Sequence, residues 1–210
     1  MHTLATLVHP GTLGDPDNQL LVGRLVANTG FLGALLKYGT FDRYSFFLGE
    51  DHGREALQIQ VEKLAPHLRE KVAFHNLLEL PAALAKGEVS VIHQYSPVDD
   101  LGAIFRLRDR YATQTVPVTG QIHSLSYPSM MLQHLKILLV RPSASDAIFC
   151  SSTAGRDALS ACYASLSESL GSGAEDLAWS LPVVPLGIHT ADARGGDREA
   201  ARANFGIPPN

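Results

Sequence analysis

The sequence predicts an α/β fold, a Rossmann-like three-layer sandwich with a mainly parallel sheet. Two observations lead to this prediction. Short apolar runs alternate with longer segments of helical spacing along the chain, which is the pattern of βαβ units. The apolar runs, such as Tyr44–Leu48 ("YSFFL") and Val89–His93 ("VSVIH"), are nearly continuous, and this is typical of strands that are covered on both faces.

The alternation sets the expected order of elements. Strands are expected at residues 4–8, 44–48, 72–74, 89–93, 116–121, 147–151 and 183–185. Helices are expected at residues 19–37, 54–64, 77–86, 99–111, 127–139, 153–167 and 197–205. In such sheets ligands bind beyond the carboxyl ends of the strands, so the segments that follow the strands are the places to look for function.

Composition narrows the class of protein. The chain has 210 residues and a net charge of −4, which disfavours a nucleic-acid binder because such a protein would show a basic stripe. It shows neither a signal-peptide pattern nor an apolar run of about 20 residues, so we expect a cytoplasmic protein. The apolar segment at residues 129–140 either packs on the sheet or makes a peripheral membrane contact.

Metal and cofactor motifs are missing from the sequence. Cys150 and Cys162 form no C-x-x-C pair and lie in different expected elements, so two reduced thiols are expected. The histidines are scattered without H-x-x-x-H spacing, and the chain contains neither a Walker A lysine motif nor a G-x-S-x-G elbow. We therefore expect no metal and no cofactor.

The segment after the first strand is the first candidate site. Gly11 and Gly14, with Thr12 between them, lie between that strand and the first long helix. Glycines there allow backbone N–H groups to approach a phosphate at a helix N-terminus. The alternative is an ordinary strand-to-helix turn, and the pattern lacks the third glycine of a dinucleotide-binding loop.

Two further candidates follow inner strands. Tyr95 comes after the strand "VSVIH" and either stacks on a ligand ring or covers the edge of the core. His123 and Ser124 follow the strand that ends in "VTGQ". A histidine at this edge can hydrogen-bond a hydroxyl or stabilise charge at neutral pH, and the alternative is a structural histidine with its hydrogen bonds satisfied.

The last candidates lie in "SDAIFCSSTAGRDAL". Ser152 and Thr153 separate a strand from a helix. Their hydroxyl groups either cap that helix or border a site where the helix N-terminus holds an anion.

These segments, taken in order, resemble a known family. The glycine turn, the strand that runs into "IHS", the segment "SDAIFCSSTAGRDAL" and the stretch "VVPLGIHTADARGGDREAARANFGIP" are similar to the acceptor-side half of retaining GT-B glycosyltransferases. Pro185, Gly187 and Ile188 match the P-x-G-I core of that family's interdomain stretch, whereas Leu186 replaces the usual asparagine and Ser124 replaces an aspartate.

The resemblance implies a function and a division of the chain. Residues 1–190 would form the N-terminal Rossmann-like domain, and residues 191–210 would begin the linker to an absent donor-binding domain with a Glu-x(7)-Glu signature. The whole enzyme would transfer a sugar from a nucleotide-diphosphate sugar to the hydroxyl of a sugar, lipid-linked or small-molecule acceptor, with retention and without a metal. This half alone would be inactive.

The resemblance also implies roles for the candidate residues. The turn at Gly11, Thr12 and Gly14 would approach the donor phosphates, and His123 would line the reaction centre as the catalytic residue. Tyr95, Ser124, Ser152 and Thr153 would border the substrate cleft. The competing hypothesis is a Rossmann-like ligand-binding or regulatory domain without catalysis, and a third is another GT-B enzyme such as a sugar-nucleotide epimerase.

Overall fold

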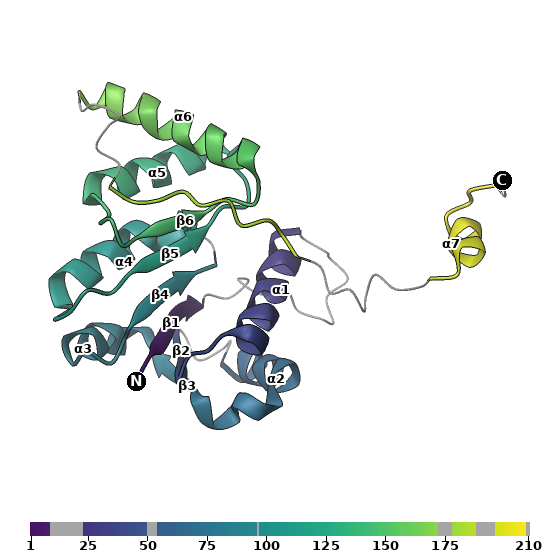
Figure 1. Ribbon diagram of the computed structural model, residues 1–210, viewed down its shortest axis with the longest axis horizontal. Helices are drawn as coiled ribbons and strands as arrows, with labels where there is room; N and C mark the ends of the chain where they lie inside the picture. The colour runs from purple at the N-terminus through teal and green to yellow at the C-terminus, as the bar shows by residue number, and fades with distance from the viewer. Residues whose placement is uncertain (9–22, 50–53, 96, 172–177, 188–195, 209–210) are drawn as a thin grey trace.

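The computed structural model describes residues 1–8, 23–49, 54–95, 97–171, 178–187 and 196–208, and a parallel β-sheet lies at its centre (Figure 1). The described strands are β1 (Thr3–Val8), β2 (Arg43–Leu48), β3 (Val72–Asn76), β4 (Val91–Gln94), β5 (Val118–Gln121) and β6 (Ala147–Phe149). They lie in the order β3-β2-β1-β4-β5-β6, and every neighbouring pair is parallel. This is the strand order of the Rossmann fold, and it confirms the predicted fold class.

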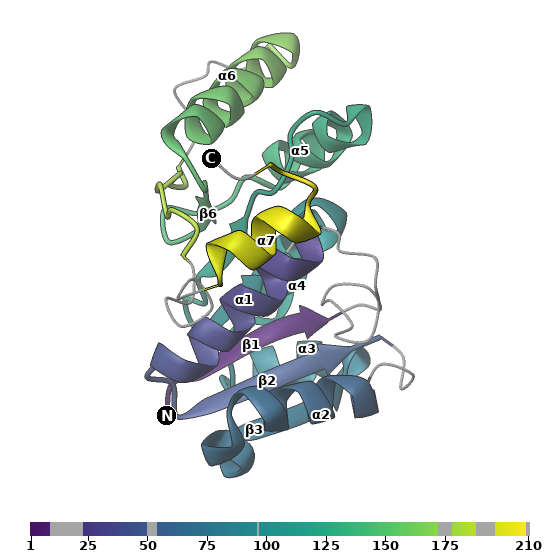
Figure 2. The same ribbon diagram turned by 90° about the vertical axis from the view of Figure 1, so that its right-hand side faces the viewer.

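Helices cover both faces of the sheet and make three layers (Figures 1 and 2). One face is covered by α1 (Gly23–Tyr38) and α2 (Arg54–Leu64), which lie in front of the sheet in Figure 2. The other face is covered by α3 (Leu80–Ala85), α4 (Pro97–Tyr111), α5 (Pro128–Val140) and α6 (Thr153–Ser169). The short helices η2 (Pro66–Lys71), η3 (Leu77–Glu79) and α7 (Arg198–Asn204) complete the described elements.

Most expected elements are present, and the differences have physical causes. The sequence predicts only a helix end at residues 66–71, where the structure has η2, because a 3-10 helix this short leaves no periodic pattern. The strand expected at residues 183–185 is reduced to an isolated bridge between Cys150 and Val183. Pro182 and Pro185 flank that bridge, and a proline cannot donate to a strand ladder.

The two faces of the sheet bury separate apolar cores. Alternate residues of β1 point to opposite faces, so Ala5 and Leu7 join one core while Leu4 and Val8 join the other. The core under α3 to α6 contains aliphatic and aromatic side chains from all four helices. The core under α1 and α2 ends toward β4 and β5, where polar side chains replace apolar ones.

A buried ion pair joins the elements near the amino ends of β5 and β6. Arg108 of α4 donates two hydrogen bonds to the carboxylate of Asp146, at 2.7 and 3.0 Å, and a third at 3.0 Å to the carbonyl of Val116. Asp146 also accepts from the backbone N–H of Val118 at 2.8 Å and of Ser143 at 2.7 Å. The carboxylate is 1% exposed, and both of its oxygens have several donors.

Within the ranges that the structure describes, we find no helix both long enough and apolar enough to cross a membrane.

Candidate functional site

The topology points to one edge of the sheet. The chain forms β1, β2 and β3 outward in one direction and then returns to place β4 on the other side of β1. The crevice at the carboxyl ends of β1 and β4 is therefore the topological switch point, where Rossmann-like folds bind ligands. Thr6 of β1 and His93 of β4 are direct neighbours in the register there.

His123 lies at this edge, just past the end of β5. Its Nε2 atom is 2.9 Å from the carbonyl oxygen of Tyr95 and 3.2 Å from the side-chain amide of Gln121. That amide is in turn 3.5 Å from the side-chain oxygen of Asn28, which α1 contributes. Asn28 and Gln121 are buried, while His123 is half-buried. The structure thus joins α1, β4 and β5 through one polar network, which we call the Asn28–Gln121–His123 network.

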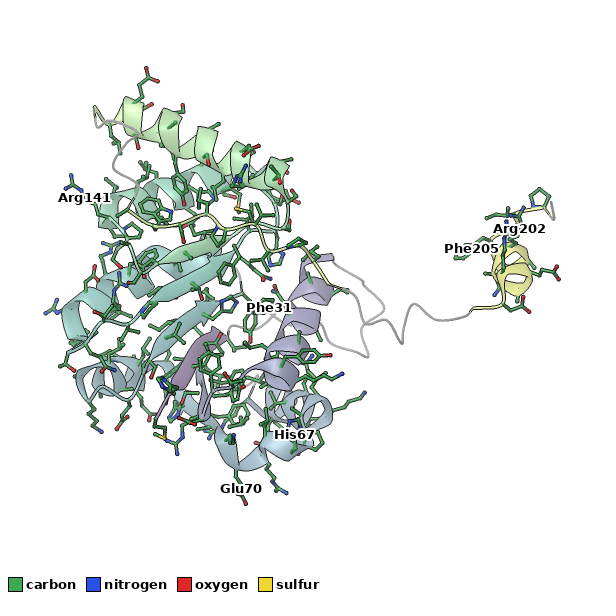
Figure 3. All side chains as sticks on the ribbon, in the orientation of Figure 1. Phe31, His67, Glu70, Arg141, Arg202 and Phe205 are labelled. Atoms are coloured by element: carbon green, nitrogen blue, oxygen red, sulfur yellow. The ribbon has the colours of Figure 1, made fainter. Side chains whose placement is uncertain are left out.

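His93 lies near this network, because its ring contacts the ring of Tyr95, whose carbonyl oxygen meets His123. It stacks on Phe31 of α1 at a centroid distance of 4.7 Å and on Phe149 of β6 at 5.9 Å. Figure 3 shows Phe31 between α1 and the sheet. Burial lowers the pKa of His93 to about 3, so the ring is neutral at pH 7. Its Nδ1 atom lies 2.9 Å from the Thr119 hydroxyl, and its Nε2 atom has no partner among the described residues.

Tyr95 has its ring in the core. The side chain is 0% exposed and packs edge-on against Phe31 and His93. Burial raises the pKa of its hydroxyl group. Of the two alternatives for this residue, the structure agrees with the core position. What Tyr95 offers to the edge is its backbone carbonyl, which meets His123.

The serine candidates occupy two separate places. The hydroxyl oxygen of Ser124 lies 3.0 Å from that of Ser126, in a local turn next to His123. Ser152 is the N-cap of α6, where its hydroxyl accepts a hydrogen bond from Gly155 N–H at 3.0 Å, and Thr153 begins the helix. Ser152 and Thr153 are exposed. Capping is therefore present, and the exposed hydroxyl groups border the same edge of the sheet because α6 begins where β6 ends.

The glycine turn falls outside the described residues. Gly11, Thr12 and Gly14 belong to the range 9–22, which lies outside the residues that the structure describes. The flanking elements show that this range connects the carboxyl end of β1 to the start of α1.

The chemistry of the edge is polar. The network presents amide, imidazole and carbonyl groups, which suit hydroxyl groups of a ligand. Among the described residues, no group of three or more His, Cys, Asp or Glu side chains could hold a metal ion. Cys150 and Cys162 are free thiols whose pKa values are raised by burial.

Sequence reasoning missed Asn28 and Gln121. A signal for Gln121 was present, because residues 121 and 123 share one face when a strand alternates. Asn28 gave a weaker signal as one of the few polar residues in the mostly apolar run "GRLVANTGFLGALL". Its burial depends on how α1 crosses the sheet, which the sequence does not show.

Fold and edge together define a class: an α/β protein of Rossmann-like architecture with polar side chains gathered where such folds bind ligands. Neither the family models nor the curated proteins nor the solved structures contain a match to this chain.

Proposed function

We propose that this chain is the acceptor-side domain of a retaining glycosyltransferase. The enzyme would transfer a sugar from a nucleotide-diphosphate sugar to the hydroxyl group of an acceptor. The observation that carries the proposal is the Asn28–Gln121–His123 network at the carboxyl edge of β4 and β5. Its amide, imidazole and carbonyl groups fit sugar hydroxyl groups, and it includes the histidine of the "IHS" segment, which contributes to the family resemblance.

The roles follow from chemistry and position. His123 would bind the transferred sugar or the acceptor hydroxyl beside the reacting atoms, and Ser124 would border it. Ser152 and Thr153 would line the same cleft at the start of α6, where backbone N–H groups and the helix dipole favour a negatively charged group. The turn with Gly11, Thr12 and Gly14 would approach the diphosphate.

The donor would be held mainly by a second domain, with closure of the two domains excluding water from the reaction. We therefore expect no turnover from these 210 residues alone. As the family resemblance implies a transfer without a metal, stabilisation of the leaving diphosphate would fall to helix N-termini and basic side chains.

The test is a transferase assay of the protein encoded by the complete reading frame that contains these residues. Purified protein is incubated with UDP-, GDP- and ADP-sugars, and products are sought by mass spectrometry in aqueous and in organic extracts, so that soluble and lipid-linked acceptors are both detected. The anomeric configuration of the product is then read by NMR, and retention is expected.

A substitution of His123 tests whether the activity depends on the carboxyl edge of the sheet. His123→Ala should lower kcat/KM by about 100-fold or more, because it removes a group placed at the reacting atoms. The matched control is His67→Ala, since His67 is exposed on η2, far from Phe31 and the site (Figure 3). If neither soluble nor lipid-linked products form, the proposal is wrong and the non-catalytic alternative replaces it. If products form with inversion, the protein is a glycosyltransferase but not a retaining one, and the proposed mechanism is wrong.

A further inference from the structure

The contact between His123 and Tyr95 decides which ring nitrogen of His123 carries a proton. The carbonyl oxygen of Tyr95 can only accept a hydrogen bond, and it lies 2.9 Å from Nε2 of His123. If Nε2 carried no proton, two lone pairs would face each other at this distance. The Nε2 atom therefore donates, and in the neutral ring the Nδ1 atom is the acceptor.

This assignment decides the orientation of the Gln121 amide. The amide atom nearest to His123 is 3.2 Å from a nitrogen that already carries a proton, so that atom must be an acceptor. Amide oxygen and nitrogen have nearly the same shape, and turning the group by 180° places the oxygen there. The same argument then turns the amide of Asn28, 3.5 Å away, so that its NH₂ group donates to the Gln121 oxygen.

The groups around the ring are held rigidly. The ring of Tyr95 is fully buried against Phe31 and His93, which fixes the carbonyl that accepts from His123. Gln121 is 7% exposed and Asn28 is 0% exposed. The Tyr95 carbonyl, just after β4, and the Gln121 amide of β5 therefore reach the imidazole from fixed positions, and Asn28 of α1 contacts that amide.

We propose that Gln121 is a positioning residue that, together with the Tyr95 carbonyl and Asn28, holds His123 as the Nε2–H tautomer and makes Nδ1 its acceptor atom. The catalytic meaning of this arrangement rests on the proposed function: the tautomer decides which ring nitrogen of His123 can donate and which can accept a hydrogen bond when a sugar or acceptor hydroxyl group binds. The tautomer itself is a property of this chain and can be measured without a substrate.

His93 supplies an internal comparison. The Thr119 hydroxyl lies 3.3 Å from the carbonyl of Ile92, to which it donates, so its oxygen accepts from Nδ1 of His93 at 2.9 Å. His93 is therefore the Nδ1–H tautomer. The two histidines at this edge should show opposite tautomers in the same spectrum.

The experiment is long-range ¹H–¹⁵N NMR of the 210-residue chain labelled with ¹⁵N-histidine, at about pH 8.5, where an ordinary histidine is neutral. The signals of His123 are identified by their loss in His123→Gln. We expect the Nε2–H pattern for His123 and the Nδ1–H pattern for His93. An Nδ1–H pattern for His123 in the unmodified chain overturns the proposal.

Three variants then test the part played by Gln121. Gln121→Glu has an acceptor at the same place and no donor, so it should keep the Nε2–H pattern. Gln121→Leu removes the acceptor and should shift His123 toward a mixture of tautomers. Gln94→Leu is the matched control, because Gln94 is also a buried glutamine at a strand end but alternates to the opposite face of the sheet. If Gln121→Glu loses the pattern, or if Gln121→Leu leaves it unchanged, Gln121 does not position the ring.

Activity measurements separate this inference from the proposed function. In the complete protein, Gln121→Leu should lower kcat by about tenfold or more, and Gln121→Glu should recover most of that loss above pH 8. If NMR confirms the tautomer but the complete protein has no transferase activity, the inference about the hydrogen bonds stands and only the proposed function is wrong. If the protein has transferase activity and Gln121→Leu does not change it, the proposed function is supported and the positioning role of Gln121 is contradicted.

Discussion

Two buried polar clusters lie at opposite ends of the strands in one half of the sheet, and they differ in how completely they are paired. At the amino ends, the carboxylate of Asp146 accepts hydrogen bonds from Arg108, Val118 and Ser143, and both oxygens are satisfied. At the carboxyl ends, Nε2 of His93 on one face of the sheet and Oε1 of Gln94 on the other face have no partner among the described residues. Among the described residues, the first set of groups is fully paired and the second is not.

This difference follows from the parallel sheet. Loops at the amino ends of strands in Rossmann-like folds carry no ligand, so a charge buried there is kept only if its partners are all internal. At the carboxyl ends, unpaired polar atoms cost free energy, and a protein keeps them where a ligand or a reaction uses them. Substitutions at the two ends should therefore have effects of different size and even of different sign.

Asp146→Asn is expected to have the largest effect on stability. The substitution leaves Arg108 buried without its full countercharge, and breaking a buried ion pair from one side costs about 3–5 kcal/mol. Urea unfolding of the purified chain should show this loss in the free energy of unfolding.

The control for this prediction is an ion pair at the surface. Asp157 pairs with Arg156 at 2.8 Å, but the Asp157 side chain is 62% exposed, so Asp157→Asn should change stability little. Asp109, which lies 2.6 Å from Nε of Arg108, remains in the Asp146→Asn protein and supports Arg108 in part. A loss no larger than that of Asp157→Asn would contradict the structural role of the amino-end cluster.

The sequence predicts the fold well because apolar runs and helical spacing are local signals. Helix α2 has the expected bounds, Arg54–Leu64, and every described strand overlaps an expected one. The prediction failed at η2, which is too short to leave a periodic pattern, and at the bridge at Val183, where prolines interrupt the expected strand. These depend on backbone hydrogen bonds that leave little pattern in the sequence.

The site could be predicted only in part. The position of His123 after β5 was readable, since ligands meet parallel sheets at their carboxyl ends. The full network around His123 was not readable, because Asn28, which contacts the Gln121 amide, lies more than 90 positions from Gln121 and comes close only when α1 crosses the sheet. Tyr95 illustrates the same limit: its carbonyl takes part in the network, while its ring, the group that sequence reasoning considers, is in the core.

The buried His93, at the carboxyl end of β4, should make the free energy of unfolding depend on pH. This effect should be smaller than that of Asp146→Asn and larger than that of Gln94→Leu. His93 has its pKa lowered from 6.5 to about 3 in the folded state, so the unfolded chain binds more protons between these values. The neutral His93 ring therefore makes its full contribution to the free energy of unfolding above about pH 6.5, and this contribution is lost as the pH falls toward 3. Between pH 7 and pH 5 the loss is about 2 kcal/mol.

His93→Phe removes this contribution, so urea unfolding at pH 7 and pH 5 should differ less than in the unmodified chain. His134, whose pKa burial lowers to about 4, keeps its own share of the dependence. The exposed, non-titrating Gln58 provides the control, since Gln58→Ala should leave the dependence unchanged. An unaltered dependence in His93→Phe would show that the ring is not buried in its neutral form.

The smallest effect, and the one of opposite sign, is expected from Gln94→Leu. The side chain is 2% exposed and its oxygen has no partner among the described residues, so leucine removes a desolvated polar atom without breaking a hydrogen bond from that atom. The free energy of unfolding should stay the same or rise by about 1 kcal/mol. Gln121→Leu is the matched comparison, because this glutamine is equally buried but paired, and its loss should destabilise by about 1 kcal/mol. If both variants destabilise the protein to the same extent, then the carboxyl-end cluster is as fully paired as the amino-end cluster, and the contrast between the two ends of the sheet does not hold.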